Sequence, residues 1–130
     1  ALDLAEVFPD LEAAIDFLMS WPALVRASLM VLARSDELDG NRYETLTPAA
    51  DALSDKHPLA AVLLRRAMVN DALNGAKSTR YRHAARHLAE CRSSDAVIKD
   101  YGNLAGHGAF LAHLKQKHQR KFGFWELVDG

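Results

Sequence analysis

Apolar residues recur along this chain at spacings of three, four and seven, which place them on one face of an α-helix. A pattern of a large apolar residue, an alanine three positions later and a leucine four positions after that occurs three times, with 35 residues between copies. The copies are Leu11, Ala14 and Leu18, then Leu46, Ala49 and Leu53, then Tyr81, Ala84 and Leu88. The small alanine lets a neighbouring helix approach closely. A recurrence of this length predicts a repeat of helical hairpins.

Prolines divide the first two copies into pairs of helices. Pro22 and Pro58 each follow a copy by a few residues, and proline suits the first turn of a helix because its missing N–H has no partner there. We therefore expect second helices over residues 22–33 and 58–73. Both are apolar on nearly all sides, so neighbouring helices must cover them.

Glycines and small polar residues mark the ends of the predicted units. Gly40 is expected to cap the end of the first unit. Pro48, behind Thr47 as N-cap, is expected to open the next helix. Asn74 and Gly75 are expected to close the second unit, and Ser78 or Thr79 to cap a helix over residues 79–92.

The third unit departs from the first two. We expect a short helix over residues 96–100, a glycine-rich loop over 102–108, an amphipathic helix around Phe110 and an apolar plug over 122–128. Terminal repeats commonly differ because they close the stack. The prediction is therefore an all-α protein, a single helical-repeat domain over residues 1–130. Antiparallel helical hairpins stack in it as a short TPR-like α-solenoid array of about seven helices, and a non-repetitive helical bundle is the alternative.

The composition is that of an ordinary globular protein. Hydrophobic residues make up 49% of the 130 positions and charged residues 25%, which excludes a disordered or collagen-like chain. Arginines such as Arg65 and Arg66 interrupt the apolar stretches before they reach the roughly 20 residues of a membrane span, so no membrane partner is expected. Cys91 is the only cysteine, and with no secretory signal pattern we expect a cytoplasmic location. Because Ala1 leads almost at once into a helical pattern, we expect the C-terminal part of a longer protein.

The net charge of −1 conceals an uneven distribution. Residues 1–60 hold eleven acids and four bases, whereas residues 61–130 hold six acids and twelve bases. The basic half suits an anionic partner, and the acidic half could associate head-to-tail with the basic half of another copy. A homo-oligomer of this chain is therefore one possible assembly.

The basic candidate site lies on the helix expected over residues 79–92. Arg80, Arg82 and Arg86 belong to this helix, and Lys121 belongs to a second basic stretch that precedes the last aromatic residues. Such bases near a helix N-terminus can hold a phosphate or contact a nucleic-acid backbone. They are the predicted ligand-binding residues, and nucleic-acid or phosphate-ligand binding through the basic half is an alternative function.

A metal site is a second alternative on the same helix. His83, His87 and Cys91 stand at i, i+4 and i+8, and nitrogen and sulfur ligands one turn apart can share a zinc ion. The three positions span about 12 Å of helix axis, which is too far for one ion to take all three easily. We therefore expect no metal and no other cofactor, and a zinc-binding accessory domain stays an alternative.

The sequence lacks the motifs that catalysis commonly needs. It contains no Gly-x-Ser-x-Gly elbow, no His-Glu-x-x-His and no Walker-type loop. We therefore expect no enzymatic activity. The leading hypothesis is a protein–protein interaction module that presents the groove lined by the first helix of each hairpin to a protein partner.

Several blocks of the chain resemble the C-terminal part of an uncharacterised bacterial family, one of the domains of unknown function. The most specific is Tyr81-Arg82-His83-Ala84-Ala85-Arg86-His87-Leu88, and others are His57-Pro58-Leu59-Ala60 and Arg120-Lys121-x-Gly123-Phe124-Trp125. The likeness extends from about residue 17 to residue 125. The tail over residues 81–125 is also similar to the helical tail of bacterial SWIM-type zinc-finger proteins, whose Cys and His zinc ligands have no counterpart here. The resemblance implies a terminal helical-repeat segment of a larger cytoplasmic protein and supplies no catalytic residue.

Overall fold

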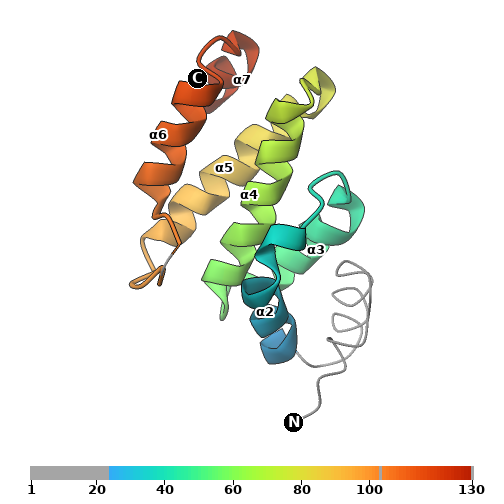
Figure 1. The fold of residues 1–130 in the computed structure, drawn as a ribbon, viewed down its shortest axis with the longest axis vertical. Coiled ribbons are helices and arrows are strands. Elements are labelled where there is room, and N and C mark those ends of the chain that lie inside the picture. The colour runs from blue at the N-terminus through green and yellow to red at the C-terminus, as the bar shows by residue number, and fades with distance from the viewer. Residues whose placement is uncertain (1–23, 103, 130) are drawn as a thin grey trace.

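The computed structural model describes residues 24–102 and 104–129 of the chain, and these residues form helices without any strand (Figure 1). The six α-helices within these ranges are α2 (Leu24–Ala33), α3 (Tyr43–Leu53), α4 (Pro58–Asn74), α5 (Tyr81–Asp95), α6 (His107–Lys117) and α7 (Phe122–Asp129). Two short 3-10 helices, η2 (Ser35–Glu37) and η3 (Ser78–Arg80), precede α3 and α5. The predicted all-α class is confirmed. The solenoid arrangement and the count of seven helices stay predictions.

Helix α4 is the central element of the described fold. As its apolar pattern predicts, helices cover it on several sides: α3 and α5 both pack against it, and α2 packs on its N-terminal half (Figure 1). The buried apolar residues of the described ranges form two clusters. The first joins the N-terminal half of α4 to α2 and α3, and the second joins its C-terminal half to α5, α6 and α7.

The second and third copies of the recurring pattern are both buried against α4. Leu53 lies in the first core cluster and Leu88 in the second. Ala49 and Ala84, the small residues of the two copies, are 0% and 1% exposed, as a close helix approach requires. The first copy, over residues 11–18, lies outside the described residues.

Helix α3 begins five residues earlier than predicted. It starts at Tyr43, and Pro48 lies inside the helix instead of opening it. An internal proline removes one backbone hydrogen bond. Leu46, two residues before the proline, is fully buried in the first core cluster, and its burial against α4 extends the helix on the N-terminal side of the proline.

The predicted cap at Gly40 is also wrong. Helix α2 ends at Ala33 and η2 at Glu37, so Gly40 belongs to the connection that leads to α3. A Cβ at Gly40 would overlap the carbonyl oxygen of Ala67 and lie 2.7 Å from Cβ of Asp71. Glycine is required here because the connection runs directly against the backbone of α4.

The junction between α4 and α5 differs partly from the prediction. Gly75 is the C-cap of α4, as expected, although the residue in the left-handed region is Ala76 with φ 51°. Helix α5 begins at Tyr81 behind η3, and neither Ser78 nor Thr79 caps it through a side chain. Helix α5 also ends later than predicted, at Asp95 instead of Arg92.

In the C-terminal third, the structure differs from the prediction at two more places. Helix α5 continues through Ser93 and Ser94 to Asp95, and the short helix predicted over residues 96–100 does not form. Gly108, predicted to be in a loop, lies in α6. The apolar plug is helix α7. Its Phe124 is fully buried in the second core cluster, whereas Phe122 is 69% exposed.

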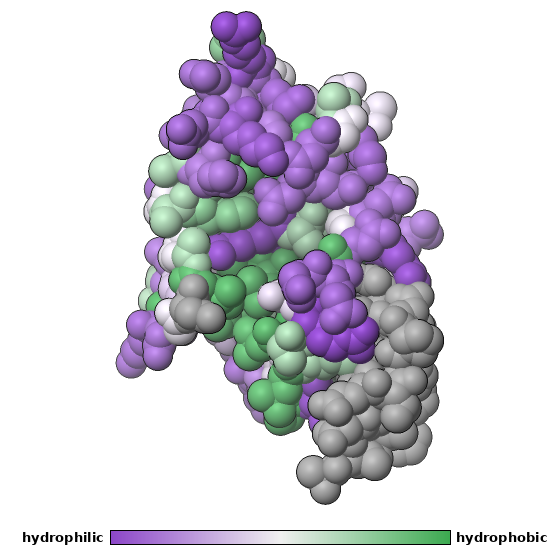
Figure 2. Space-filling model, in the orientation of Figure 1, coloured by the Kyte–Doolittle hydropathy of each residue, from purple (hydrophilic) through white to green (hydrophobic). Residues whose placement is uncertain are grey.

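Polar and apolar side chains are unevenly distributed on the surface. On the face shown in Figure 2, hydrophilic residues cover the end of the molecule that α6 and α7 form, and apolar residues gather around α2. Val25 and Leu29 of α2 are each 60% exposed. None of the helices in residues 24–102 and 104–129 has the length and apolar character of a membrane span.

Candidate functional site

Two consecutive arginines of α4 are buried. Arg65 and Arg66 have exposed fractions of 3% and 7%, although arginine is rarely buried unless it is paired. Consecutive helical residues point about 100° apart. The two side chains therefore enter different surroundings, and within the described residues only Arg65 pairs with carboxylates.

Arg65 is paired with acids from both neighbouring helices. Its Nη2 donates to Oδ1 of Asp51 on α3 at 3.0 Å and lies 2.7 Å from Oε2 of Glu90 on α5. The charge of Arg65 is thereby balanced, and the side chain connects α3, α4 and α5. We assign it a structural role.

Arg66 makes no hydrogen bond or ion pair with any residue that the structure describes. Its Nε and Nη2 are buried without an acceptor. The guanidinium carbon lies 4.5 Å from the ring centroid of Phe110 and 5.5 Å from that of Tyr101, so aromatic faces provide its nearest favourable contacts. Burial lowers the pKa of Arg66, but an arginine remains charged at neutral pH.

Tyr101 is held in place by the end of α5. Its hydroxyl donates to Oδ1 of Asp95 at 2.6 Å. Burial together with this hydrogen bond raises the pKa of Tyr101 to about 12. The phenol therefore stays protonated, and its ring is positioned beside the guanidinium of Arg66.

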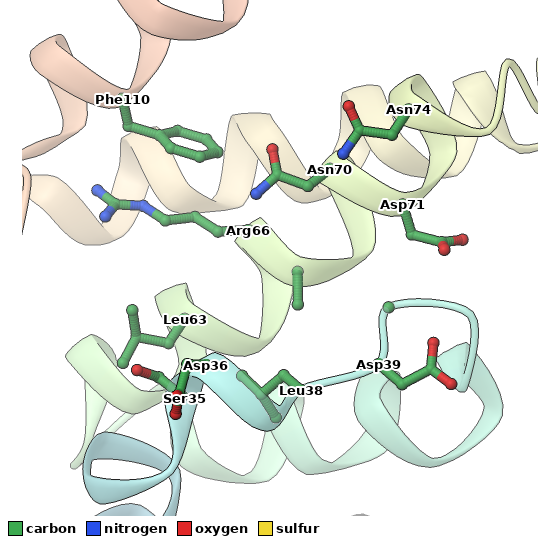
Figure 3. A pocket seen from close by; sticks show the side chains of 12 residues that line it. Ser35, Asp36, Leu38, Asp39, Leu63, Arg66, Asn70, Asp71, Asn74 and Phe110 are labelled. Carbon is green, nitrogen blue, oxygen red and sulfur yellow. The ribbon is translucent and has the colours of Figure 1, made fainter.

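Arg66 lines a cavity of about 500 Å³ between α4, α6 and the connection from α2 to α3, which we call the α4 groove (Figure 3). One wall carries Arg66, Asn70 and Asn74 from α4, with Phe110 from α6. The opposite wall carries Ser35, Asp36, Leu38 and Asp39 from the connection. The groove thus has a cationic and amide-bearing wall facing an acidic one.

The acidic wall is fixed against α4 by local contacts. Gly40 allows the connection to touch the helix backbone. Lys77 Nζ then ties the two together, because it donates to Asn41 Oδ1 at 3.0 Å and to Asp71 Oδ2 at 2.7 Å. This pair balances the charge of Asp71, which lines the groove from the α4 side.

Comparison with known proteins places the chain in a family. The sequence model of a family of unknown function, DUF6880, matches residues 1–127. The chain belongs to the DUF6880 family. Comparisons with curated proteins and with solved structures gave no match. The sequence was expected to belong to a family of unknown function, and this expectation is confirmed. Bacterial origin and the likeness to SWIM-type proteins stay predictions.

The bases predicted from sequence have different surroundings in the DUF6880 fold. The guanidinium of Arg80 lies 3.6 Å from the ring centroid of Tyr43. Arg86 Nε lies 3.3 Å from Oε1 of Glu90. Arg82 is exposed on α5, and Lys121 is half-buried in the turn before α7. Binding of nucleic acid or phosphate through these four residues stays a prediction.

The three candidate zinc ligands differ in how deeply they are buried. His83 is exposed, whereas His87 is 6% exposed and Cys91 is fully buried. Burial raises the pKa of Cys91 to about 12 and lowers that of His87 to about 4. The Cys91 Sγ–H donates to the carbonyl of Val62 at 3.9 Å. Within the two described ranges, no three His, Cys, Asp or Glu residues lie together as metal ligands.

Sequence reasoning missed the α4 groove and its arginine. The available signal was a pair of charged residues, Arg65 and Arg66, inside a helix that is otherwise apolar on nearly all sides. Such a helix must be covered by neighbours, so charged residues in its middle are expected to be buried as well. The sequence did not show which of the two would find a carboxylate.

Proposed function

We propose that this domain is a protein-interaction module without catalytic activity and that the α4 groove is its binding surface. The observation that carries the proposal is the guanidinium of Arg66, buried at an open groove with no acceptor for Nε and Nη2. A buried charge without a hydrogen-bond partner is costly. Buried polar groups are normally hydrogen-bonded. A bound partner that supplies the acceptor for Nε and Nη2 would explain why Arg66 lacks one here.

A protein partner fits the groove better than a nucleic acid does. Asp36 lines the wall opposite Arg66, and its negative charge would repel a phosphodiester backbone. A protein segment can offer cations and carboxylates together. The cavity also has apolar surface from Leu38 and Phe110, which suits the mixed character of protein interfaces.

The test is affinity capture with a variant in which the groove is filled. Asn70 is half-buried on the groove wall, so Asn70→Trp places a large side chain in the cavity. The matched control is Gln116→Trp, at an exposed position of α6 that does not line the groove. Wild-type and variant domains are immobilised in equal amounts, and bound lysate proteins are quantified by mass spectrometry.

We expect at least one protein to be retained by the wild type and by Gln116→Trp and to be lost with Asn70→Trp. Circular dichroism and thermal melting must first show that both variants fold. Recovery of nothing above the bare resin, or equal recovery by all three domains, would contradict the proposal.

A further inference from the structure

We propose that the turn between α6 and α7 binds single-stranded nucleic acid. The binding surface consists of Lys117, Arg120, Lys121 and Phe122, which we call the α6–α7 corner. The three bases contact the phosphates of one strand, and the ring of Phe122 stacks on a base. The corner lies at the end of the molecule opposite α2 (Figure 1). None of its four residues lines the α4 groove, so the inference does not depend on the proposed function.

Positive charge gathers at this corner without acidic neighbours in the chain. Residues 101–125 contain four bases and no Asp or Glu. Lys117 and Arg120 are exposed, and Lys121 is half-buried. The side chains of these three bases make no hydrogen bond or ion pair with any residue that the structure describes. Such unpaired bases attract an anionic chain, because their contacts with phosphates release the counterions of that chain.

The buried His118 shows that these charges converge. Its side chain is 7% exposed. Burial, followed by the positive charges of Lys121, Lys117 and His113, lowers the pKa of His118. Lys117 ends α6 and Lys121 precedes α7, so the turn brings charges from both sides of His118 to one place. A single strand can therefore contact both lysines.

Hydrogen bonds and core packing hold the turn in place. The carbonyl oxygen of His118 accepts from the backbone N–H of Lys121 at 3.0 Å and from Nε1–H of Trp125 at 2.9 Å. Phe124 is fully buried in the second core cluster, and its ring centroid lies 5.8 Å from that of Tyr81 on α5. The corner is therefore shaped before a ligand arrives, which reduces the entropy lost on binding.

Phe122 is an aromatic side chain that the core does not use. It is 69% exposed, whereas Phe124 is fully buried. Its Cα lies at most about 8 Å from that of Arg120, because only Lys121 stands between them. An exposed ring beside cations suits a single strand, since every base offers a face for stacking. The bases of a duplex are already stacked on one another, so the ring favours a single strand.

An anionic membrane suits the corner less well. A bilayer would contact the whole exposed face of α7, which includes Glu126 and Asp129. Anionic headgroups would repel these two carboxylates. A single strand can follow the turn without covering the face of α7, so the exposed acids do not oppose it.

The experiment measures binding of two fluorescently labelled ten-nucleotide oligomers, oligothymidine and oligouridine, to the full chain. Anisotropy is recorded at a series of salt concentrations. The logarithm of the binding constant should fall with the logarithm of the salt concentration with a slope of about −2, since each of three phosphate contacts contributes about −0.7. The two oligomers should bind with similar affinity, because stacking and phosphate contacts tolerate different sequences.

Variants separate stacking from charge. Phe122→Ala should weaken binding about fivefold or more at every salt concentration and leave the slope unchanged, because one stacked base is lost. Lys117→Gln should make the slope less steep by about 0.7, because one phosphate contact is lost. Leu127→Ala on α7 and Lys99→Gln before α6 are the matched controls. Both positions are exposed and outside the corner, so these variants should bind like the wild type.

Three results would overturn the inference. The first is that neither oligomer binds saturably at the lowest salt concentration. The second is that Phe122→Ala binds as tightly as the wild type, or that a labelled decamer of glutamate binds as tightly as the oligomers, since charge alone would then explain the attraction. The third is that the chain sediments with vesicles of phosphatidylserine and phosphatidylcholine in a Phe122-dependent way but binds no oligomer, which would assign the corner to a membrane surface.

Discussion

Glu90 Oε2 on α5 lies 2.7 Å from Nη2 of Arg65 on α4, in an ion pair whose arginine is buried and whose glutamate is partly exposed. The same guanidinium reaches Asp51 on α3. Arg65 thus pairs with acidic residues of α3 and α5, the two described helices that carry the recurring apolar pattern. Its neighbour Arg66 has no carboxylate partner in the described part of the chain, and this contrast leads to two stability predictions.

Glu90→Gln should lower the free energy of unfolding by about 2 kcal/mol, because the buried guanidinium of Arg65 loses its nearer charged acceptor. Arg86→Gln is the matched control. It removes the exposed Arg86–Glu90 pair and should change stability by less than about 0.5 kcal/mol. Urea unfolding followed by circular dichroism measures both. Equal effects of the two substitutions would show that Arg65 does not depend on Glu90.

Arg66→Met should raise the free energy of unfolding by about 1 kcal/mol, because an apolar side chain of similar length replaces a buried charge that has no partner. Methionine also packs well against the rings of Phe110 and Tyr101. Arg86→Met on the exposed face of α5 serves as the control, with no gain expected. A clear loss of stability in Arg66→Met would mean that the aromatic contacts outweigh desolvation of the guanidinium.

Gly40→Ala should lower the free energy of unfolding by about 2 kcal/mol, since the new Cβ overlaps the backbone of α4 at Ala67 and the connection must move. Gly108 lies in α6 with open space around it. Gly108→Ala should therefore be stabilising by about 0.5 kcal/mol through helix propensity. Thermal melting compares the two, and a tolerated Gly40→Ala would contradict the close approach.

His87 should make the protein less stable as the pH falls. Burial, followed by the positive charges of Arg65 and Arg80, lowers its pKa from 6.5 to about 4. Between these values the unfolded chain binds a proton that the folded chain does not, so stability is full above pH 6.5 and declines toward pH 4. The decline from this group is at most about 1.4 kcal/mol per pH unit.

The variant His87→Gln isolates this contribution. Burial also lowers the pKa of His107 and His118, so the wild type alone reports several groups. Urea unfolding of both proteins at pH 4.5 to 7.5 should give a difference curve that is flat above pH 6.5 and slopes below it. Parallel curves across this range would remove His87 as a source of the pH dependence.

Cys91 should react with thiol reagents only when the protein opens. It is fully buried, and burial raises its pKa to about 12. Labelling with a disulfide reagent at pH 8 should be at least about 100-fold slower in the native protein than in guanidinium chloride, because a core position opens rarely. Added zinc should not change the native rate. Rapid labelling, or protection that requires zinc, would restore the metal alternative.

Local patterns along the chain determined the class and the central element of this fold. A helix apolar on nearly all sides had to be covered, and the copies that contain Leu53 and Leu88 both pack on it as α3 and α5. These features follow from hydrophobic periodicity, which depends on residues a few positions apart.

Only the tertiary structure decided the features that depend on distant segments. The sequence could not tell that Arg65 would meet Asp51 and Glu90 while Arg66 would end at a groove, because the acceptors belong to other helices. Nor could it tell that Gly40 serves a close approach to α4 instead of a cap. Burial and pairing of a polar side chain depend on which surfaces meet, and that choice is made by packing of the whole chain.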